Sequence, residues 1–170
     1  LHKEQIDILR QHKSVTVESV HMRKDGTIFP IESSISLISL SGKEVTMGID
    51  RDITDRKKSD DQLRKLFRAV EQSPATIVIT DIKGDIEYVN PKFEETSGYA
   101  FEEVMGKNPR ILSSGNMTKQ DYAIMWETIL SGNEWRGEFY NKKKNGEYFW
   151  ESASISPITD SNNNITHIVA

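Results

Sequence analysis

The sequence contains one stretch twice, first as Arg23-Lys24-Asp25-Gly26-Thr27-Ile28-Phe29 and again as Lys143-Lys144-Asn145-Gly146-Glu147-Tyr148-Phe149. The same offset aligns Ser34-Ile35-Ser36 with Ser154-Ile155-Ser156 without a gap. Short stretches match by chance, but a constant offset over a long segment indicates an internal repeat. The chain therefore contains two related copies of one structural unit.

Both copies predict a hairpin whose turn is Lys-Asp-Gly or Lys-Asn-Gly, because Gly, Asn and Asp tolerate the positive φ of tight turns. Residues 15–20, before the first turn, are β-branched and alternating, as in a strand. A long strand is predicted after each turn, at 27–39 and 147–158, and a third at 45–50 and 165–170. Each copy therefore predicts a three-stranded antiparallel meander.

The second meander is preceded by a long segment that has no counterpart before the first. This segment predicts strands at 75–81 and 85–90, followed by a short helix that Asn90-Pro91 begins and Gly98 ends. Only residues 1–13, with a helical pattern at Ile6, Leu9 and Arg10, precede the first meander. We therefore expect the first copy to lack its first half.

Three further helical segments are predicted. A short turn lies at 101–105, and a helix over 118–130 has an apolar face at helical spacing, formed by Tyr122, Met125, Trp126, Ile129 and Leu130. Residues 55–72 are charged, lack Gly and Pro, and carry Leu63, Leu66 and Val70 at helical spacing. They predict an amphipathic helix that either packs on one domain face or forms a short coiled coil.

The composition excludes several classes of protein. Apolar residues are 36% and charged residues 28% of the chain, and the net charge is −4, so no basic surface for nucleic acid is expected. No apolar run approaches the ~20 residues of a membrane helix, and residues 1–13 do not resemble a signal peptide. Cysteine is absent, which excludes disulfides, thiolate catalysis and Cys-ligated zinc. These features favour a cytoplasmic protein without a membrane segment.

Several short motifs follow one another in the second copy and its preceding segment: Thr80-Asp81, Tyr88 to Phe93, Thr96 to Tyr99, Gly106 to Leu112, Trp135 to Glu138, and Asn141 to Pro157. Because of these motifs, residues 73–170 resemble a PAS domain, the small sensor fold of bacterial signalling proteins. The resemblance implies an α+β fold with a five-stranded antiparallel sheet, short helices on one face and a pocket between them.

Residues 14–54 resemble the C-terminal half of another PAS domain. They end in Asp52-Ile53-Thr54, the family's usual exit from its last strand into a signalling helix. We therefore expect half a PAS domain at 1–54, a linker helix at 55–72, and at 73–170 a PAS domain that lacks its C-terminal exit.

The resemblance implies a tandem PAS and PAC sensory-box fragment of a bacterial-type signalling protein, such as a sensor histidine kinase or a cyclic-di-nucleotide enzyme. No nucleophile–base pair or phosphate loop occurs in the chain, so we expect no enzyme here and place any output enzyme elsewhere in a longer protein. The module would sense a small ligand or a redox state and relay it through helices. The alternative is a ligand-free dimerisation or protein-interaction module. A homodimer through the linker helix or the sheet is expected.

A flavin is the cofactor that the resemblance favours. Blue-light members have a reactive Cys where this chain has Pro109, so a cysteinyl photoadduct is excluded. The segment of Asn108 and Arg110 is more similar to redox-sensing members, which bind FAD. By resemblance Asn141 would contact the ring, and Glu151 stands where light sensors have a second Asn; the two can face each other across the hairpin. The alternative is an empty or small-ligand pocket in which they bond backbone, water or Arg110.

The tryptophans and histidines give weaker evidence for a cofactor site than Asn141 and Glu151 do. Trp135 precedes a strand and either covers the pocket mouth as a cofactor contact or packs in the protein; Trp126 is expected in the core. Trp150 alternates with Phe149, so one of the two faces outward. The resemblance implies that a haem-binding member would carry its iron ligand on the predicted helix over 118–130. None of the four histidines, His2, His12, His21 and His167, lies there, so haem and metal are not expected.

Two further expectations concern the first copy. By resemblance, Asp52 and Thr54 tie the end of the domain to the following helix; Asp52 can accept backbone N–H groups there, and Thr54 can cap a helix beginning at Asp55. An ordinary cap without a signalling role is the alternative. The isolated meander is expected to expose apolar side chains and to pack on another chain or on residues 73–170; those side chains are Val15, Val17, Ile31, Ile35 and Leu37.

Overall fold

The computed structural model describes residues 9–170 and divides into two compact units, one up to Lys65 and one from Leu66 onward. The boundary falls inside a single helix, α2 (Thr54–Glu71). The helical pattern predicted at Ile6 lies outside the described residues.

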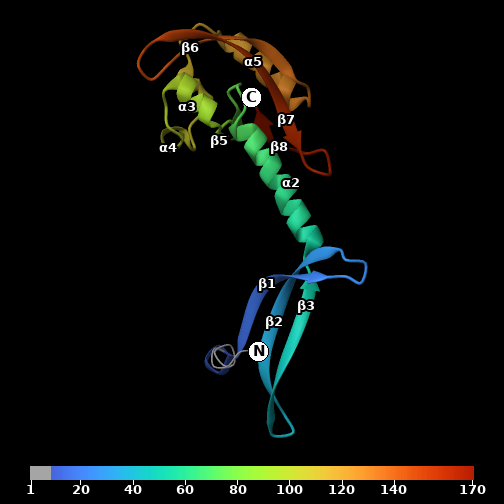
Figure 1. The fold of residues 1–170 in the computed structure, drawn as a ribbon. Helices are drawn as coiled ribbons and strands as arrows, with labels where there is room; N and C mark the ends of the chain where they lie inside the picture. Colours follow the sequence, from blue (N-terminus) through green and yellow to red (C-terminus); the bar gives the residue numbers. More distant parts are fainter. Residues whose placement is uncertain (1–8) are drawn as a thin grey trace. The chain divides into compact units, whose positions relative to one another are not determined.

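The first unit contains a three-stranded antiparallel meander in the order β1-β2-β3 (Figure 1). Its strands are β1 (Ser14–Met22), β2 (Ile28–Leu40) and β3 (Lys43–Asp52). Gly26 turns the first hairpin with a φ of 86°, in the left-handed region that favours glycine. β3 extends beyond the predicted 45–50 because its ladder with β2 runs from Lys43 to Asp52.

The first unit buries part of the apolar face that the sequence predicted to be exposed. Ile31 is only 1% exposed, so its predicted exposure is wrong. Asp52 pairs with Ile31 in the ladder, and the N–H of Ile53 donates to the carbonyl of Pro30 at 3.1 Å. These contacts bring Ile53, itself buried, beside this end of β2. Of the other four predicted positions, Val17 is exposed, while Val15, Ile35 and Leu37 are half-buried.

The amphipathic pattern correctly predicts α2, which begins at Thr54, one residue before the expected Asp55. Its first turn is tied to the meander by ion pairs from Arg56 and Lys57 to Glu18, at 2.6 Å each, and from Arg56 to Glu32 at 3.2 Å. None of its residues is buried. Its apolar stripe is exposed, with Leu63 and Leu66 at 66% and Phe67 at 58%.

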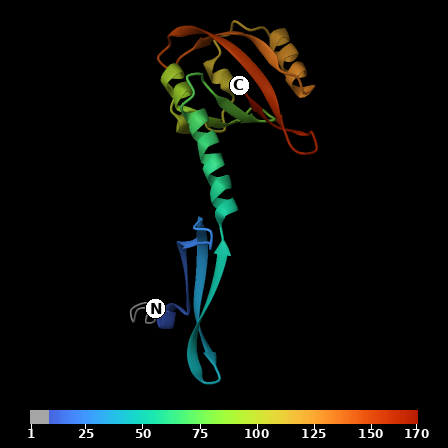
Figure 2. The same ribbon diagram turned by 45° about the vertical axis from the view of Figure 1, so that its right-hand side comes forward.

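The second unit contains a five-stranded antiparallel sheet in the order β5-β4-β8-β7-β6. The strands are β4 (Val78–Asp81), β5 (Ile86–Val89), β6 (Trp135–Lys142), β7 (Tyr148–Thr159) and β8 (Ile165–Val169). Between β5 and β6 the chain forms α3 (Pro91–Ser97), α4 (Phe101–Val104), the 3₁₀ turn η1 (Pro109–Leu112) and α5 (Lys119–Leu130). The predicted α+β fold, with a five-stranded sheet and short helices, is confirmed (Figure 1, Figure 2).

Local capping residues set the ends of these helices. Asn90 caps α3 by accepting the N–H of Phe93, and Gly98 ends that helix with a φ of 77°. Thr118 and Asp121 form a reciprocal capping box at the start of α5. The sequence predicted both helices at nearly these positions, because their signals are local.

Two apolar clusters fill the space between the sheet and the helices. One cluster joins β4 and β5 to the first helices through Val78, Ile86, Val89, Phe93, Val104 and Leu112. The other joins α5 to β7 and β8 through Met125, Ile129, Ile155 and Ile168. Leu130, which the sequence places on the apolar face of this helix, is the last residue of α5 and is 55% exposed.

Strand β4 begins at Val78, whereas the sequence predicted a strand from residue 75. The buried side chain of Asn90 accounts for the difference. Its Oδ1 accepts the N–H of Ile77 at 2.9 Å and its Nδ2 donates to the carbonyl of Ala75 at 3.0 Å. A side chain thus satisfies backbone groups that a strand partner would otherwise bind.

Candidate functional site

A cavity of about 930 Å³ lies in the second unit, between the inner face of the sheet and the segments η1 and α5. Its wall is largely apolar and includes Ile77, Phe93, Leu112, Trp126, Phe139 and Ile155. This volume is within the ~300–1,000 Å³ range of small-molecule sites. The cavity therefore gives the second unit room for a ligand with a ring system.

A hydrogen-bonded group of polar side chains lies on the cavity wall, formed by Thr76, Asn141 and Glu151. Asn141 Nδ2 donates to Glu151 Oε2 at 2.8 Å, and Thr76 Oγ1 donates to Glu151 Oε1 at 3.0 Å. The structure thus brings together the two residues that the sequence singled out on β6 and β7. Their partners are each other and Thr76, which the sequence did not single out as a site residue.

Asn108 and Arg110 also line the cavity. Asn108 caps η1, and its Oδ1 accepts both the backbone N–H and the Nε–H of Arg110 at 3.1 Å. Its Nδ2 donates to the carbonyl of Gly84 at 3.0 Å, in the turn between β4 and β5. Asn108 therefore fixes the position of Arg110 and joins η1 to the sheet.

The three tryptophans lie in different environments. Trp126, which was expected in the core, is half-buried: it packs against the α5 cluster and also lines the cavity. Trp135 is half-buried and covers Gly137, with its ring centroid 5.3 Å from that of Phe139; among the described residues, the cavity wall does not include it. Trp150 faces outward and is 66% exposed, whereas Phe149 is half-buried.

Asp52 and Thr54 form a compact junction in the first unit, where β3 passes into α2. Asp52 Oδ1 accepts the N–H of Thr54 at 2.9 Å and its hydroxyl at 2.5 Å, and Asp52 Oδ2 accepts Arg23 at 2.7 Å. The bond from the Thr54 hydroxyl, then the Thr54 N–H and Arg23, hold the pKa of Asp52 below its usual value. Thr54 is the first residue of α2 rather than the residue before it.

A second junction joins the end of α2 to β5 within the second unit. The Tyr88 hydroxyl donates to the Glu71 carboxylate, and the Tyr88 ring contacts that of Phe67 with centroids 6.2 Å apart. Burial, then the hydrogen bond and charge of Glu71, raise the pKa of Tyr88 to about 12. The sequence missed this contact because nothing in the local pattern marks a tyrosine as the partner of a glutamate in a preceding helix.

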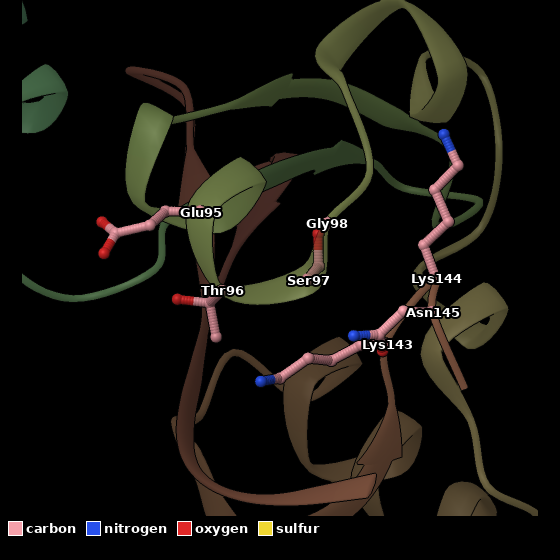
Figure 3. Close-up of a pocket in the computed structure, with 7 residues that line it drawn as sticks. All are labelled: Glu95, Thr96, Ser97, Gly98, Lys143, Lys144 and Asn145. Carbon is pink, nitrogen blue, oxygen red and sulfur yellow. The ribbon is translucent and has the colours of Figure 1, made fainter. Parts of the chain in front are cut away.

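A smaller hollow of about 310 Å³ lies between the end of α3 and the β6–β7 turn. Figure 3 shows that the charged ends of Glu95, Lys143 and Lys144 point in different directions. Lys144 bonds Glu103 at 2.6 Å, and Lys143 bonds Glu147 at 3.2 Å. Their charges are thus neutralised within the protein, and the hollow presents no convergent set of groups to a ligand.

Residues 9–170, which the structure describes, contain no group of three or more His, Asp or Glu side chains placed to hold a metal ion. They also contain no helix that is both long enough and apolar enough to cross a membrane.

Comparison with known proteins identifies the family. The family profile described as the PAS domain matches residues 4–55 and 74–170. A nitrogen fixation regulatory protein of Klebsiella oxytoca is 32% identical over 104 residues, which cover 61% of this chain and 21% of the relative. The aerotaxis receptor of Escherichia coli K12 is 33% identical over 79 residues, covering 46% of this chain and 16% of the receptor.

The fold comparison agrees with these matches. The LOV domain of a blue-light activated histidine kinase from Erythrobacter litoralis is 27% identical and superposes with a TM-score of 0.53, covering 58% of this chain and 93% of that domain. The chain spans about a fifth of the length of the nitrogen fixation relative, 21%. By their names these relatives are a regulatory protein, a receptor and a light-activated kinase. The chain belongs to the PAS domain family.

Proposed function

We propose that residues 73–170 sense the redox state of a flavin, FAD, held in the cavity, and that helices flanking the PAS domain relay the signal to an output domain elsewhere in a longer protein. The observation that carries the proposal is the paired Asn141 and Glu151 on the wall of a largely apolar cavity of about 930 Å³. Polar groups in such a wall are suited to recognise the polar edge of a ligand.

The donor and acceptor set fits a flavin. The imide edge of the flavin ring offers one N–H donor and two carbonyl acceptors. The Glu151 carboxylate can accept the N–H, and the Asn141 amide can donate to a carbonyl. Arg110 and Lys119 add positive charge to the wall and can bind phosphate oxygens. A bound flavin would supply reversible electron transfer; the protein's own residues bind and orient it.

The absorption spectrum of the purified protein tests this proposal. We expect flavin bands, or uptake of added FAD by the colourless protein, and weaker uptake by Asn141→Ala. Asn133→Ala is the matched control, because Asn133 is an exposed residue between α5 and β6 that does not line the cavity. A protein that neither contains nor takes up FAD would contradict the flavin proposal.

A second candidate function is a ligand-free module for dimerisation. The observation that favours it is the exposed apolar stripe of α2, in which Leu63 and Leu66 are each 66% exposed. Exposed apolar stripes at helical spacing are typical of helix partners. For either function we propose that the chain has three parts, at 1–54, 55–72 and 73–170. We also propose a signalling role for Asp52 and Thr54, at the point where β3 meets α2.

A further inference from the structure

Thr76 and Glu151 join two distant parts of the second unit. Thr76 lies in the segment between α2 and β4, and Glu151 lies on β7. The Thr76 hydroxyl donates to Glu151 Oε1 at 3.0 Å, and both residues line the cavity. A molecule in the cavity therefore lies beside this hydrogen bond.

The backbone on both sides of Thr76 is held by one side chain, Asn90, which is 0% exposed. Asn90 Nδ2 donates to the carbonyl of Ala75 at 3.0 Å, and Asn90 Oδ1 accepts the N–H of Ile77 at 2.9 Å. The same Nδ2 donates to the carbonyl of Val70, in the last turn of α2, at 3.2 Å. The position of Thr76 is thus connected through Asn90 to the end of α2.

The two oxygens of Glu151 each accept one donor from the protein. Oε2 accepts Asn141 Nδ2 at 2.8 Å, and Oε1 accepts the Thr76 hydroxyl. An ionised carboxylate can only accept hydrogen bonds. The protein donor that a ligand N–H meets at Oε1 is the Thr76 hydroxyl.

We propose that the Thr76–Glu151 hydrogen bond is a latch that a ligand opens. An N–H donor that replaces the Thr76 hydroxyl at Glu151 Oε1 frees Thr76, loosens residues 73–77 and weakens the hold of Asn90 on Val70. The last turn of α2 then opens more often, so occupancy of the cavity is reported at this helix. The inference rests on the proposed sensing function only in that a ligand enters the cavity; the latch itself is formed by the protein alone.

Amide hydrogen exchange of the whole chain without ligand tests the latch. The informative amides are those of Gln72 and Ser73, which donate to the carbonyls of Arg68 and Val70 at the end of α2. Thr76→Val removes the hydroxyl at nearly constant volume, and we expect these amides to exchange about two- to tenfold faster, as loss of one hydrogen bond implies. Thr76→Ser restores the hydroxyl and should restore the wild-type rates.

The chain offers a matched control in Thr80, which also lines the cavity. Its hydroxyl donates to the carbonyl of Asp81 at 2.9 Å and not to Glu151. Thr80→Val should therefore leave the exchange of Gln72 and Ser73 unchanged. Equal acceleration by Thr76→Val and Thr80→Val would overturn the latch, because any loss of a cavity hydroxyl would then suffice.

A double-mutant cycle with Glu151→Ala adds an independent criterion. If the hydrogen bond is the latch, the double variant exchanges no faster at Gln72 than either single variant. Additive effects of the two substitutions would overturn it. Glu151→Ala removes the acceptor of the same bond and keeps the experiment interpretable if Thr76→Val folds poorly.

Added FAD distinguishes the latch from the flavin proposal. FAD that binds and accelerates exchange at Gln72 in the wild type, but not further in Thr76→Val, supports both. FAD that binds without changing this exchange overturns the latch and leaves the flavin proposal standing. If FAD does not bind while Thr76→Val still accelerates exchange, the flavin proposal fails and the coupling of Thr76 to α2 is supported.

Discussion

Gly84, in the turn between β4 and β5, lies close to the side chains of Asn108 and Trp126. Its φ is 87°, and a Cβ there would lie 2.6 Å from Asn108 Nδ2 and 3.2 Å from the Trp126 ring. We expect Gly84→Ala to lower the free energy of unfolding by about 1–2 kcal/mol for the left-handed backbone and by about 1–3 kcal/mol more for overpacking.

Urea denaturation of Gly84→Ala and of a control variant measures the backbone and overpacking contributions separately. Gly132→Ala is the matched control, because Gly132 has a φ of 85° and nothing within 4 Å of its Cβ position. It should show the backbone cost alone. Equal losses in the two variants would mean that Asn108 and Trp126 move aside without cost.

Tyr88 gives the second unit a pH dependence in the alkaline range. Its pKa is raised to about 12 by burial and by Glu71, whereas a phenol in the unfolded chain ionises near pH ~10. The folded state therefore keeps a proton that the unfolded state releases, and this contribution to stability is complete below pH ~10 and is lost as the pH rises through about 12.

We expect Tyr88→Phe to reduce the fall in unfolding free energy over this alkaline window, as measured by denaturant titration at several pH values. Tyr148→Phe is the control, because Tyr148 lies on β7 and is 49% exposed. If both variants keep the wild-type slope against pH, the raised pKa of Tyr88 does not contribute to folding.

At the scale of elements, the start of α2 depends on Asp52. Hydrogen bonds from the Thr54 hydroxyl, the Thr54 N–H and Arg23 lower the pKa of Asp52. Its stabilising contribution is therefore present above the unfolded pKa of ~3.9 and is lost as the pH falls through the lower, folded value. We expect Asp52→Ala to speed amide exchange in the first turn of α2 and to remove this acid-dependent fraying.

Asp55→Ala provides the comparison, because Asp55 is an acidic residue in the same first turn and lies outside the hydrogen bonds that join Asp52 to Thr54 and Arg23. It should change the exchange of this turn less than Asp52→Ala does. A larger effect of Asp55→Ala would mean that negative charge near the N-terminus of α2 stabilises its first turn, and not the Asp52–Thr54 junction.

The elements differ in how far the sequence could predict them. The meanders, α3 and α5 were predictable because alternation, turn glycines and caps are local signals. The start of β4 was not, since Asn90, far along the chain, takes the backbone groups of Ala75 and Ile77. For the same reason the cross-hairpin pair Asn141 and Glu151 was predictable from its turn, whereas Thr76, which is 75 positions from Glu151 in sequence, was not.

At the scale of the whole molecule, the two units have separate cores of unequal content. The buried apolar side chains described in the first unit are Leu9, Ile31 and Ile53, whereas the second unit holds two clusters. We expect thermal unfolding in two steps, with the meander of β1, β2 and β3 unfolding first. A single unfolding transition, with both sheets equally protected from hydrogen exchange below it, would contradict this order.

The first of these steps also reports whether the meander is covered by a second copy of the chain. Near the β1–β2 turn, Val20, Met22 and Ile28 are 65%, 71% and 66% exposed. If a dimer buries these side chains, each tenfold rise in protein concentration adds about 1.4 kcal/mol per mole of dimer to the first step. Met22→Glu should weaken this dependence, while Lys24→Glu, a matched change in the turn itself, should keep it. A first step that is independent of concentration would exclude self-association through this face and leave the α2 stripe as the candidate dimer contact.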